Sequence, residues 1–431
     1  MNSQLRTFVK HIFTGFGFGP IQAGLFAKEA FESRSFSRIV AAEIDQALVD
    51  AVRANKGSYY VNVAGTNGID VLKIDGVELL NPKVAADRKI LLEVLAQSTE
   101  VTTCLPSVNF YDTGGAAGVA AAIAEGLNNS IAEATIIYAA ENHNHAAEIL
   151  QQTVTKKVGP PVGKKVQFLN TVIGKMSRVV DDSAEIKQLG LRTITPAIKR
   201  AFLVEEFNRI LVTRTRLAGF RPGIEVFVEK DDLLPFEEAK LYGHNAIHSL
   251  LGFLGAVRGY TKMTEIGKDR LIMQIGRDAF LQESGAALIK KYAHLGDGLF
   301  TEAGYRDYAE DLLGRMTNPY LADTVARVCR DAVRKLGTTE RIFGTMQLVL
   351  EYGIEPKNMA LAAMAGVAVL LAKSQEYNLP SNLRFSDWRK LGGPDIEKII
   401  NWLWKDQRCK NSERLIQYVQ AAKDHLIGLL G

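Results

Sequence analysis

The chain has little cysteine and no long apolar run, and each absence removes a class of protein. Its 431 residues contain three cysteines, Cys104, Cys329 and Cys409. Because they are odd in number and far apart, they predict neither a disulfide framework nor a CxxC metal site. No stretch of about 20 uninterrupted apolar residues occurs, so we expect no membrane span and no membrane partner.

Positive charge is not concentrated either. The formal net charge is +4, and no Lys/Arg tract is present. Nucleic-acid-binding proteins usually gather positive charge in a patch or run, so we expect no nucleic-acid partner. The mild excess suits attraction of an anionic small molecule. Residues 1–13 lack the apolar core and cleavage site of a signal peptide, which predicts a cytoplasmic location.

Composition and length are those of a globular protein with two domains. Hydrophobic residues make up 47% of the chain and charged residues 23%, an ordinary balance for a folded protein. Alternating strands and helices predict an α/β, Rossmann-type doubly wound sheet domain over residues 1–228. Long amphipathic helices predict a mainly α-helical domain over residues 229–431. The turn Arg221-Pro222-Gly223 is the nearest feature to a boundary signal.

A glycine-rich turn joins the first predicted strand, residues 9–16, to a helix within residues 19–31. A second strand at 38–45 and a helix at 46–55 complete a βαβ unit. One glycine permits the tight turn, another lets the backbone approach a pyrophosphate, and the helix amino terminus offers N–H groups to the phosphates. The pattern is GxGxIxxG rather than GxGxxG, and a turn without a ligand is the alternative interpretation. The predicted dinucleotide-binding residues of the turn are Gly17, Phe18, Gly19, Pro20, Ile21 and Gly24.

The second strand ends in two acidic residues, Glu43 and Asp45. An acid at this point can bind both ribose hydroxyls of an adenosine, and Glu43 is the better placed of the two. A carboxylate there repels a 2′-phosphate. The sequence therefore predicts NAD, rather than NADP, as the cofactor.

Residues 57–82 predict an inserted β-meander. Its β-branched and aromatic runs are divided by Asn67-Gly68 and Asp75-Gly76, dipeptides typical of tight turns between strands. Extra strands are also expected between Leu203 and Leu217.

Polar side chains follow three further predicted strands. Thr102 and Thr103 end one, Glu141 and Asn142 end the next, and Asn170 ends the strand at residues 164–170. In a doubly wound sheet the carboxyl ends of the strands line the ligand crevice. We therefore predict that the two threonines, Glu141 and Asn142 contact the cofactor.

Lys240, Asn245 and His248 place an amine, an amide and an imidazole on one predicted helix. At about 100° per residue, Asn245 lies about 140° and His248 about 80° round the helix from Lys240, so all three can face one cavity. A buried lysine beside polar groups and a nicotinamide cation can titrate well below its usual pKa of about 10.4. It can then accept an alcohol proton while hydride leaves the same carbon. The amides of Asn170 and Asn245 can hold the charge that develops on the oxygen, and His248 can bind a neighbouring hydroxyl.

Two other interpretations of this segment stay open on spacing alone. Lys240 and Asn245 can be solvated residues of an ordinary helix. His244 and His248 have the spacing of a helical zinc site, with His143 and His145 as further candidate ligands. No HExxH motif or carboxylate cluster completes a ligand set, so we predict no metal and a buried, satisfied His244.

Over nearly its whole length the chain resembles the polyol-specific long-chain dehydrogenase/reductase family. The matching segments are GFGPIQAG, AAEID, YYVNVAGTNGIDVLKIDGVE, TIIYAAEN, FLNTVIGKMS, VEEFNRILV, KLYGHNAIH and NPYLADTVARVCRDAVRKL. The resemblance implies a Rossmann-type domain, a helical domain, and metal-independent hydride transfer to NAD. It also implies that Lys240 is the catalytic base, Asn170 and Asn245 the oxyanion pair and His248 the substrate-binding histidine, in a site formed by both domains.

The chain departs from the family at Pro20, often Asn, and at Gly174 and Lys175, which replace an aspartate-containing continuation. We expect a polyol phosphate and a ketose phosphate as the substrate pair, namely mannitol 1-phosphate and fructose 6-phosphate. The alternatives are a dehydrogenase of an unphosphorylated polyol or a hexuronate, and a NAD-binding regulatory protein on the same fold. The candidate phosphate ligands are Arg315, Arg327, Arg330, Arg334 and Lys335.

Overall fold

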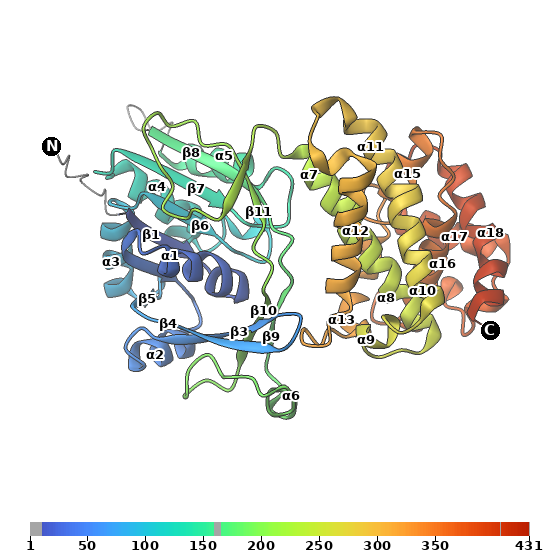
Figure 1. The fold of residues 1–431 in the computed structure, drawn as a ribbon, viewed down its shortest axis with the longest axis horizontal. Coiled ribbons are helices and arrows are strands. Elements are labelled where there is room, and N and C mark those ends of the chain that lie inside the picture. The colour runs from blue at the N-terminus through green and yellow to red at the C-terminus, as the bar shows by residue number, and fades with distance from the viewer. Residues whose placement is uncertain (1–10, 159–164, 406, 431) are drawn as a thin grey trace. The chain divides into compact units, whose positions relative to one another are not determined.

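The computed structural model describes residues 11–158, 165–405 and 407–430. The chain divides into two compact units, Met1–Leu234 and Pro235–Gly431, which Figure 1 colours from blue to green and from yellow-green to red. The first unit is mixed α/β and the second is helical, which confirms the predicted fold class. Residues 9 and 10 of the first predicted strand, and Lys164 of a later one, lie outside the described residues.

The strands of the first unit are β1 (His11–Phe16), β2 (Phe36–Ala42), β3 (Tyr59–Ala64), β4 (Ile69–Ile74), β5 (Val77–Leu80), β6 (Glu100–Thr103), β7 (Ala134–Ala139), β8 (Lys165–Val172), β9 (Ser177–Val180), β10 (Ala201–Glu205), β11 (Ile210–Thr213) and β12 (Phe227–Lys230). Its main helices are the π-helical turn η1 (Gln22–Phe26), α1 (Ala27–Ser33), α2 (Gln46–Ala54), α3 (Ala85–Leu95), α4 (Val119–Asn128), α5 (Ala146–Val158) and α6 (Ser183–Leu189). The boundary predicted between residues 228 and 229 falls inside β12, which pairs with β11 of the first unit.

The larger sheet has the Rossmann strand order. Among the described residues it holds eight strands, in the order β12-β11-β8-β7-β6-β1-β2-β5. The strands from β5 to β8 in this order are parallel. This matches the order 3-2-1-4-5-6 of dinucleotide-binding sheets, with the reversal of winding between β1 and β6. Figure 1 labels β5, β1, β6, β7, β8 and β11 of this sheet in the first unit.

The predicted β-meander at residues 57–82 is wrong in its last strand. β3 and β4 form an antiparallel hairpin, with Tyr59 opposite Ile74. β5 leaves this hairpin and pairs in parallel with β2 in the larger sheet, while β3 pairs with β10 in a separate sheet of order β4-β3-β10-β9. The Asp75-Gly76 turn therefore links two sheets. A turn dipeptide specifies a local reversal, but the buried faces decide which strand pairs next.

Two hydrophobic cores cover the two faces of the larger sheet. Residues of one strand point alternately to opposite faces, and along β1 Phe13 belongs to one core and Phe16 to the other. The first core includes side chains of α1, α2 and the smaller sheet, and the second includes side chains of α3, α4 and α5. A mostly parallel sheet buried on both faces is typical of doubly wound folds.

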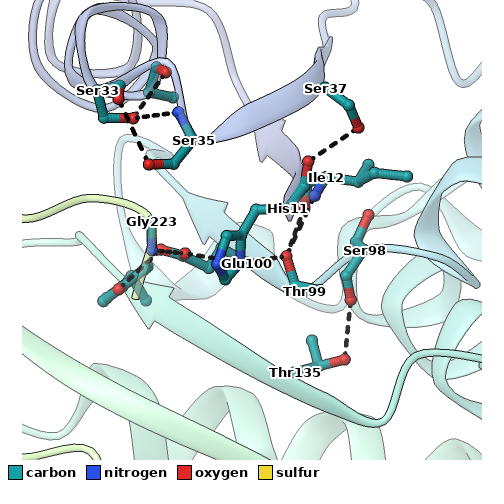
Figure 2. Close-up of polar contacts among 12 residues, drawn as sticks. His11, Ile12, Ser33, Ser35, Ser37, Ser98, Thr99, Glu100, Thr135 and Gly223 are labelled. Atoms are coloured by element: carbon teal, nitrogen blue, oxygen red, sulfur yellow. Dashed lines mark hydrogen bonds and ion pairs between the residues drawn. The ribbon is translucent and has the colours of Figure 1, made fainter. Parts of the chain in front are cut away.

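A buried carboxyl group ties the segment before β12 to the sheet, as Figure 2 shows. Glu100, in β6, is fully buried and accepts hydrogen bonds from Gly223 N–H and from the Tyr138 hydroxyl at 3.0 Å. His11 Nδ1 lies 3.6 Å from the same carboxyl group. Burial raises the pKa of Glu100 to about 7, although the hydrogen bonds that it accepts oppose the shift. The turn considered as a boundary signal is thus an internal contact of the first unit.

The main helical segments of the second unit are α7 (Leu234–Glu238), η4 (Ala239–Asn245), α8 (Ala246–Arg258), α9 (Met263–Ile266), α10 (Arg270–Asp278), η5 (Ala279–Gly285), α11 (Ala286–Tyr292), α12 (Glu302–Met316), α13 (Val325–Val328), α14 (Ala332–Lys335), α15 (Phe343–Glu351), α16 (Lys357–Ala372), α17 (Gly393–Trp404) and α18 (Ser412–Leu430). The residues of α16 from Met359 to Leu371 are all buried, and α16 packs against α8 and α18. A helix that is apolar all round is typical of a core position. Among the described residues, no helix is long and apolar enough to cross a membrane.

Candidate active site

The glycines of the turn after β1 have separate physical roles. Gly17 has a φ of +80°, and a Cβ atom there would lie 2.7 Å from Cys104 O. A Cβ atom at Gly24 would lie 2.6 Å from Val204 Cγ1, so this glycine allows the helix to pack on the smaller sheet. A Cβ atom at Gly19 would have nothing within 4 Å, which leaves this backbone open to a ligand. A tight turn, an approachable backbone and close packing are the requirements of a pyrophosphate-binding turn.

The helix after the turn begins at Pro20. Gly19 O accepts its first helical hydrogen bond, from Ala23 N at 2.9 Å. Proline suits the first helical position because its φ is already helical and no N–H is lost there. The departure from the family at Pro20 is therefore compatible with a helix start at this point. The N–H groups of a first helical turn need partners from outside the helix, which favours an anion at this end.

Glu43 stands beside the glycine turn, directly after β2. Its carboxylate accepts hydrogen bonds from Phe18 N at 2.8 Å, Ile44 N at 2.7 Å and Asp45 N at 2.8 Å. Asp45, the other acid considered, instead caps α2 and pairs with Arg200 at 2.6 Å. Of the two acids, Glu43 is the one in direct contact with the turn.

The residues predicted at strand ends lie along one edge of the larger sheet. Neighbouring strands pair Phe16 with Thr103, Thr103 with Ala139, and Ala139 with Asn170. The prediction that β8 ends at Asn170 is wrong, because pairing with β11 extends the strand to Val172. Asn170 nevertheless lies level with the carboxyl ends of β1, β6 and β7.

The two threonines at the end of β6 have partners inside the first unit. Thr102 Oγ1 donates to Gln22 Oε1 at 2.8 Å, and Thr103 Oγ1 donates to Glu141 Oε2 at 2.9 Å. Both side chains are fully buried. These contacts join the strand to the helix of the glycine turn and to the end of β7, and contact of Thr102 or Thr103 with a cofactor stays a prediction.

Glu141 forms hydrogen bonds with the segment that follows β6. Its buried carboxylate also accepts hydrogen bonds from the Tyr111 hydroxyl and from Leu105 N, the latter at 2.8 Å. Burial raises the pKa of Glu141 despite these bonds. The next residue, Asn142, is exposed at the same edge of the sheet. Direct cofactor contacts of Glu141 and Asn142 likewise stay predictions.

Both polar atoms of the Asn170 side-chain amide make hydrogen bonds. Oδ1 accepts a hydrogen bond from Ala147 N at 2.8 Å, and Nδ2 donates to Glu148 Oε2 at 2.8 Å. Both partners belong to the first turn of α5. An amide NH₂ group has two N–H bonds, and the contact with Glu148 uses one of them. This arrangement fixes the direction of the second N–H, as an oxyanion donor requires.

In the second unit, Lys240 and Asn245 lie in the π-helical segment η4, between α7 and α8. The prediction of a regular α-helix at this point is wrong. Hydrogen bonds in a π-helix run from residue i to residue i+5, which brings residues five apart towards the same face. Lys240 and Asn245 are therefore closer in direction than the about 140° calculated for an α-helix. Single π-helical turns of this kind are frequent at functional sites.

Lys240 is half-buried, which does not fit a fully solvated helix lysine. Its pKa is lowered from 10.5 to about 8, first by burial and then by the positive charge of Arg341, while the negative charge of Glu237 opposes the shift. A lysine with this pKa is partly neutral near neutral pH, and the neutral amine can accept a proton.

His248, in α8, contacts an ion pair. Its Nε2 lies 3.5 Å from Asp323 Oδ2, and Asp323 accepts hydrogen bonds from Arg327 at 2.6 and 2.8 Å. Burial alone would raise the pKa of Asp323, but His248 and Arg327 outweigh it and hold that pKa well below its usual range. Burial lowers the pKa of His248, with Asp323 opposing, which favours the neutral ring. Sequence reasoning missed Asp323, whose only local signal is its i,i+4 spacing to Arg327.

The four histidines considered as metal ligands form two pairs, one in each unit. The rings of His244 and His248 lie 6.3 Å apart in the second unit, and those of His143 and His145 lie 6.2 Å apart in the first. His244 is buried, and burial followed by nearby positive charges holds its pKa well below the usual value. Among the described residues, no group of three or more His, Cys, Asp or Glu side chains is arranged to hold a metal ion.

The basic residues considered as phosphate ligands have different surroundings. Three are paired with carboxylates: Arg315 with Asp311, Arg327 with Asp323, and Arg334 with Glu340. Arg330 is exposed. Lys335 is buried, and its amine donates to Val328 O. Sequence reasoning missed Arg341, which lies six residues beyond Lys335 and outside every motif. Arg341 is only 9% exposed, and its positive charge lowers the pKa of Lys240.

The first unit has the Rossmann strand order and a glycine turn, and the second unit carries a lysine of lowered pKa. Together these features define the protein as a Rossmann-type dehydrogenase. Comparison with known proteins gives the family. The profile of the mannitol dehydrogenase C-terminal domain matches residues 232–382. Mannitol-1-phosphate 5-dehydrogenase of Brevibacillus brevis is 30% identical over 358 residues, which cover 82% of this chain and 84% of that protein. The enzyme of the same name from Buchnera aphidicola is 29% identical over 350 residues, with coverages of 80% and 83%.

The chain therefore belongs to the mannitol dehydrogenase family, as its sequence resemblance predicts, and is an oxidoreductase of the polyol dehydrogenase type. Solved structures agree on the fold. Pseudomonas fluorescens mannitol 2-dehydrogenase, in a ternary complex with NAD and D-mannitol, matches with a TM-score of 0.70 at 16% identity, covering 98% of this chain and 94% of that one. A substrate-free D-sorbitol dehydrogenase matches with a TM-score of 0.76 at 15% identity and the same coverages.

Proposed function

We propose that the protein is a NAD-dependent, metal-independent dehydrogenase that interconverts mannitol 1-phosphate and fructose 6-phosphate. The observation that carries the proposal is the half-buried side chain of Lys240, with a pKa of about 8, in the same π-helical segment as Asn245. The relatives that share about 30% of the sequence are named as mannitol-1-phosphate 5-dehydrogenases, which favours the phosphorylated substrate.

NAD fits the residues around the glycine turn. The open backbone at Gly19 and the helix start at Pro20 suit a pyrophosphate, and the carboxylate of Glu43 suits the two ribose hydroxyls. The negative charge of Glu43 disfavours the 2′-phosphate of NADP. When bound, NAD supplies the acceptor for the hydride that leaves the carbinol carbon.

Side chains of this protein then accept the hydroxyl proton and stabilise the charge on the oxygen. The neutral amine of Lys240 takes the hydroxyl proton as the carbinol carbon is oxidised to a carbonyl, so that no metal-bound base is required. N–H groups of Asn245 and Asn170 donate to the oxygen while its negative charge develops. His248, oriented by Asp323, binds a neighbouring hydroxyl or the carbonyl. These roles stay predictions for each of the four residues.

A panel of NADH oxidation assays tests the substrate. With the purified full chain, we expect NADH consumption with fructose 6-phosphate and little with fructose or a keto-uronate. Consumption with fructose or the keto-uronate, and none with fructose 6-phosphate, would replace the proposal by a dehydrogenase of an unphosphorylated polyol or a hexuronate. NAD binding without turnover of any of the three substrates would favour the regulatory protein. Undiminished activity after EDTA treatment is the expected result for a metal-independent enzyme.

A further inference from the structure

Arg341 is a buried cation that lacks a close carboxylate partner among the described residues. Its side chain is 11% exposed, and its Nε atom makes no hydrogen bond within the described part of the chain. The nearest paired carboxylate oxygen, on Glu340, lies 3.6 Å away, which is longer than a hydrogen bond. Glu340 is shared with Arg334, at 3.3 Å. A buried guanidinium left in this state costs free energy that a bound anion recovers.

The surroundings of Arg341 add positive charge. Its charge lowers the pKa values of Lys240 and Lys335, so both amines lie near enough to add positive charge when they are protonated. Lys335 is itself buried. Helix α15 begins at Phe343, two residues after Arg341, and its first turn has neither an acidic residue nor a side-chain cap. The positive end of a helix dipole favours negative charge at this point.

We propose that Arg341 binds the phosphate group of the sugar substrate and that this contact makes the enzyme selective for a phosphorylated polyol. This inference rests on the proposed function, which it deepens by naming the residue that recognises the phosphate. A guanidinium presents paired N–H donors that match two oxygens of a phosphate, and a phosphate dianion offsets more than one buried cation. The other candidates are less suitable, because Arg315, Arg327 and Arg334 are paired with carboxylates.

The test compares wild type with Arg341→Gln, Arg341→Lys and the control Arg330→Gln, an exposed arginine of the same region. KM is measured for fructose 6-phosphate and for fructose. In Arg341→Gln we expect the KM for fructose 6-phosphate to rise on the order of 10–100-fold, since a charged hydrogen bond is lost, with a much smaller change for fructose. The KM of Arg341→Lys for fructose 6-phosphate should fall between those of wild type and Arg341→Gln, because lysine keeps the charge without the paired donors. Arg330→Gln should match wild type.

Binding of inorganic phosphate, measured by calorimetry on the same proteins, gives a readout that does not need turnover. Loss of phosphate binding in Arg341→Gln alone supports the inference, and equal binding in wild type and Arg341→Gln overturns it. A wild type that binds no phosphate also overturns it. Melting temperatures of each variant show whether the helical unit is still folded, and Arg341→Lys decides the question if Arg341→Gln does not fold.

A wild type that oxidises NADH only with an unphosphorylated sugar contradicts the proposed function, whatever Arg341 binds. A wild type that uses fructose 6-phosphate, with an unchanged KM in Arg341→Gln, contradicts only the role of Arg341. Glu340→Gln should have the opposite effect to Arg341→Gln, because removal of the neighbouring carboxylate should tighten phosphate binding. If Glu340 and Arg341 form only a structural ion pair, the variant should lose stability without any gain in phosphate affinity.

Discussion

The guanidinium of Arg341 and the amine of Lys240 are like charges in one helical unit, and after burial the Arg341 charge is the largest cause of the lowered Lys240 pKa. The carboxylate of Glu237 opposes the shift without cancelling it. Lys240 therefore titrates at about 8. The pair thus links the proton acceptor of the proposed reaction to the residue proposed to recognise the substrate.

The rate of polyol oxidation should rise with pH through about 8, the pKa of Lys240. The neutral amine is the form that accepts a proton, so below this pKa each pH unit should lower kcat/KM about tenfold. Ketose reduction uses the protonated amine and should decline over the same range. Rate profiles in both directions from pH 6 to 10 measure the two trends, and a profile that is flat in both directions argues against Lys240 as the base.

Replacement of Arg341 by Gln should move this oxidation profile to higher pH. Loss of a nearby positive charge makes the protonated amine of Lys240 less unfavourable and so raises its pKa. Arg341→Lys keeps the charge and should leave the midpoint close to that of wild type. The midpoints come from profiles of kcat/KM, which report pKa values of the free enzyme. Equal midpoints in wild type and Arg341→Gln would show that the two charges do not interact.

Lys240→Ala should lower turnover by about 10²–10⁴-fold, the usual contribution of a positioned general base. Affinity for NAD should stay near normal, because the residues proposed to hold NAD belong to the first unit. Steady-state kinetics and a fluorescence titration with NADH check the two expectations. Turnover at the wild-type rate would remove Lys240 from the mechanism.

Glu43→Ala should weaken NAD binding and narrow the preference for NAD over NADP. The carboxylate is the group proposed to bind the ribose hydroxyls and to repel a 2′-phosphate. Glu43 also accepts hydrogen bonds from Phe18 N, Ile44 N and Asp45 N, and Glu43→Ala removes all three, so a second variant is needed to separate the loss of charge from the loss of these bonds. Glu43→Gln keeps an acceptor and removes the charge, and should change mainly the ratio of kcat/KM values for the two cofactors. An unchanged ratio in both variants speaks against the ribose role.

Glu100→Gln should remove a pH-dependent part of the stability. The folded-state pKa of Glu100 is raised by burial from 4.5 to about 7, so between these values the folded protein keeps a proton that the unfolded chain releases. Its contribution to stability is present below the lower value and is lost as pH rises to the upper one, by at most about 1.4 kcal/mol per pH unit.

The measurement is denaturant unfolding of wild type and Glu100→Gln at pH 5 and pH 7.5. The wild-type free energy of unfolding should fall relative to that of the variant between the two pH values. A difference that does not change with pH would show that the buried carboxyl group of Figure 2 is not protonated in the folded state.

Several features of the site could be predicted from the sequence because they depend on backbone geometry and short spacings. The spacing of Gly17, Gly19 and Gly24 after a strand predicts a phosphate-binding turn, and Glu43 follows at the end of the next strand. The mixed α/β and helical halves follow from the hydrophobic pattern. The strand pairing of β5 was not predictable in this way, because a turn dipeptide carries no information about distant partners.

The sequence by itself determined the family, the glycine turn and the presence of Lys240, Asn245 and His248 in one segment. Only the tertiary structure decided the π-helical register that brings Lys240 and Asn245 towards one face, the contact of His248 with Asp323, and the burial of Arg341. The physical reason is that solvent exposure and the distances between charges depend on packing between helices far apart in the chain. Those two quantities set the pKa of Lys240 and leave Arg341 short of a partner.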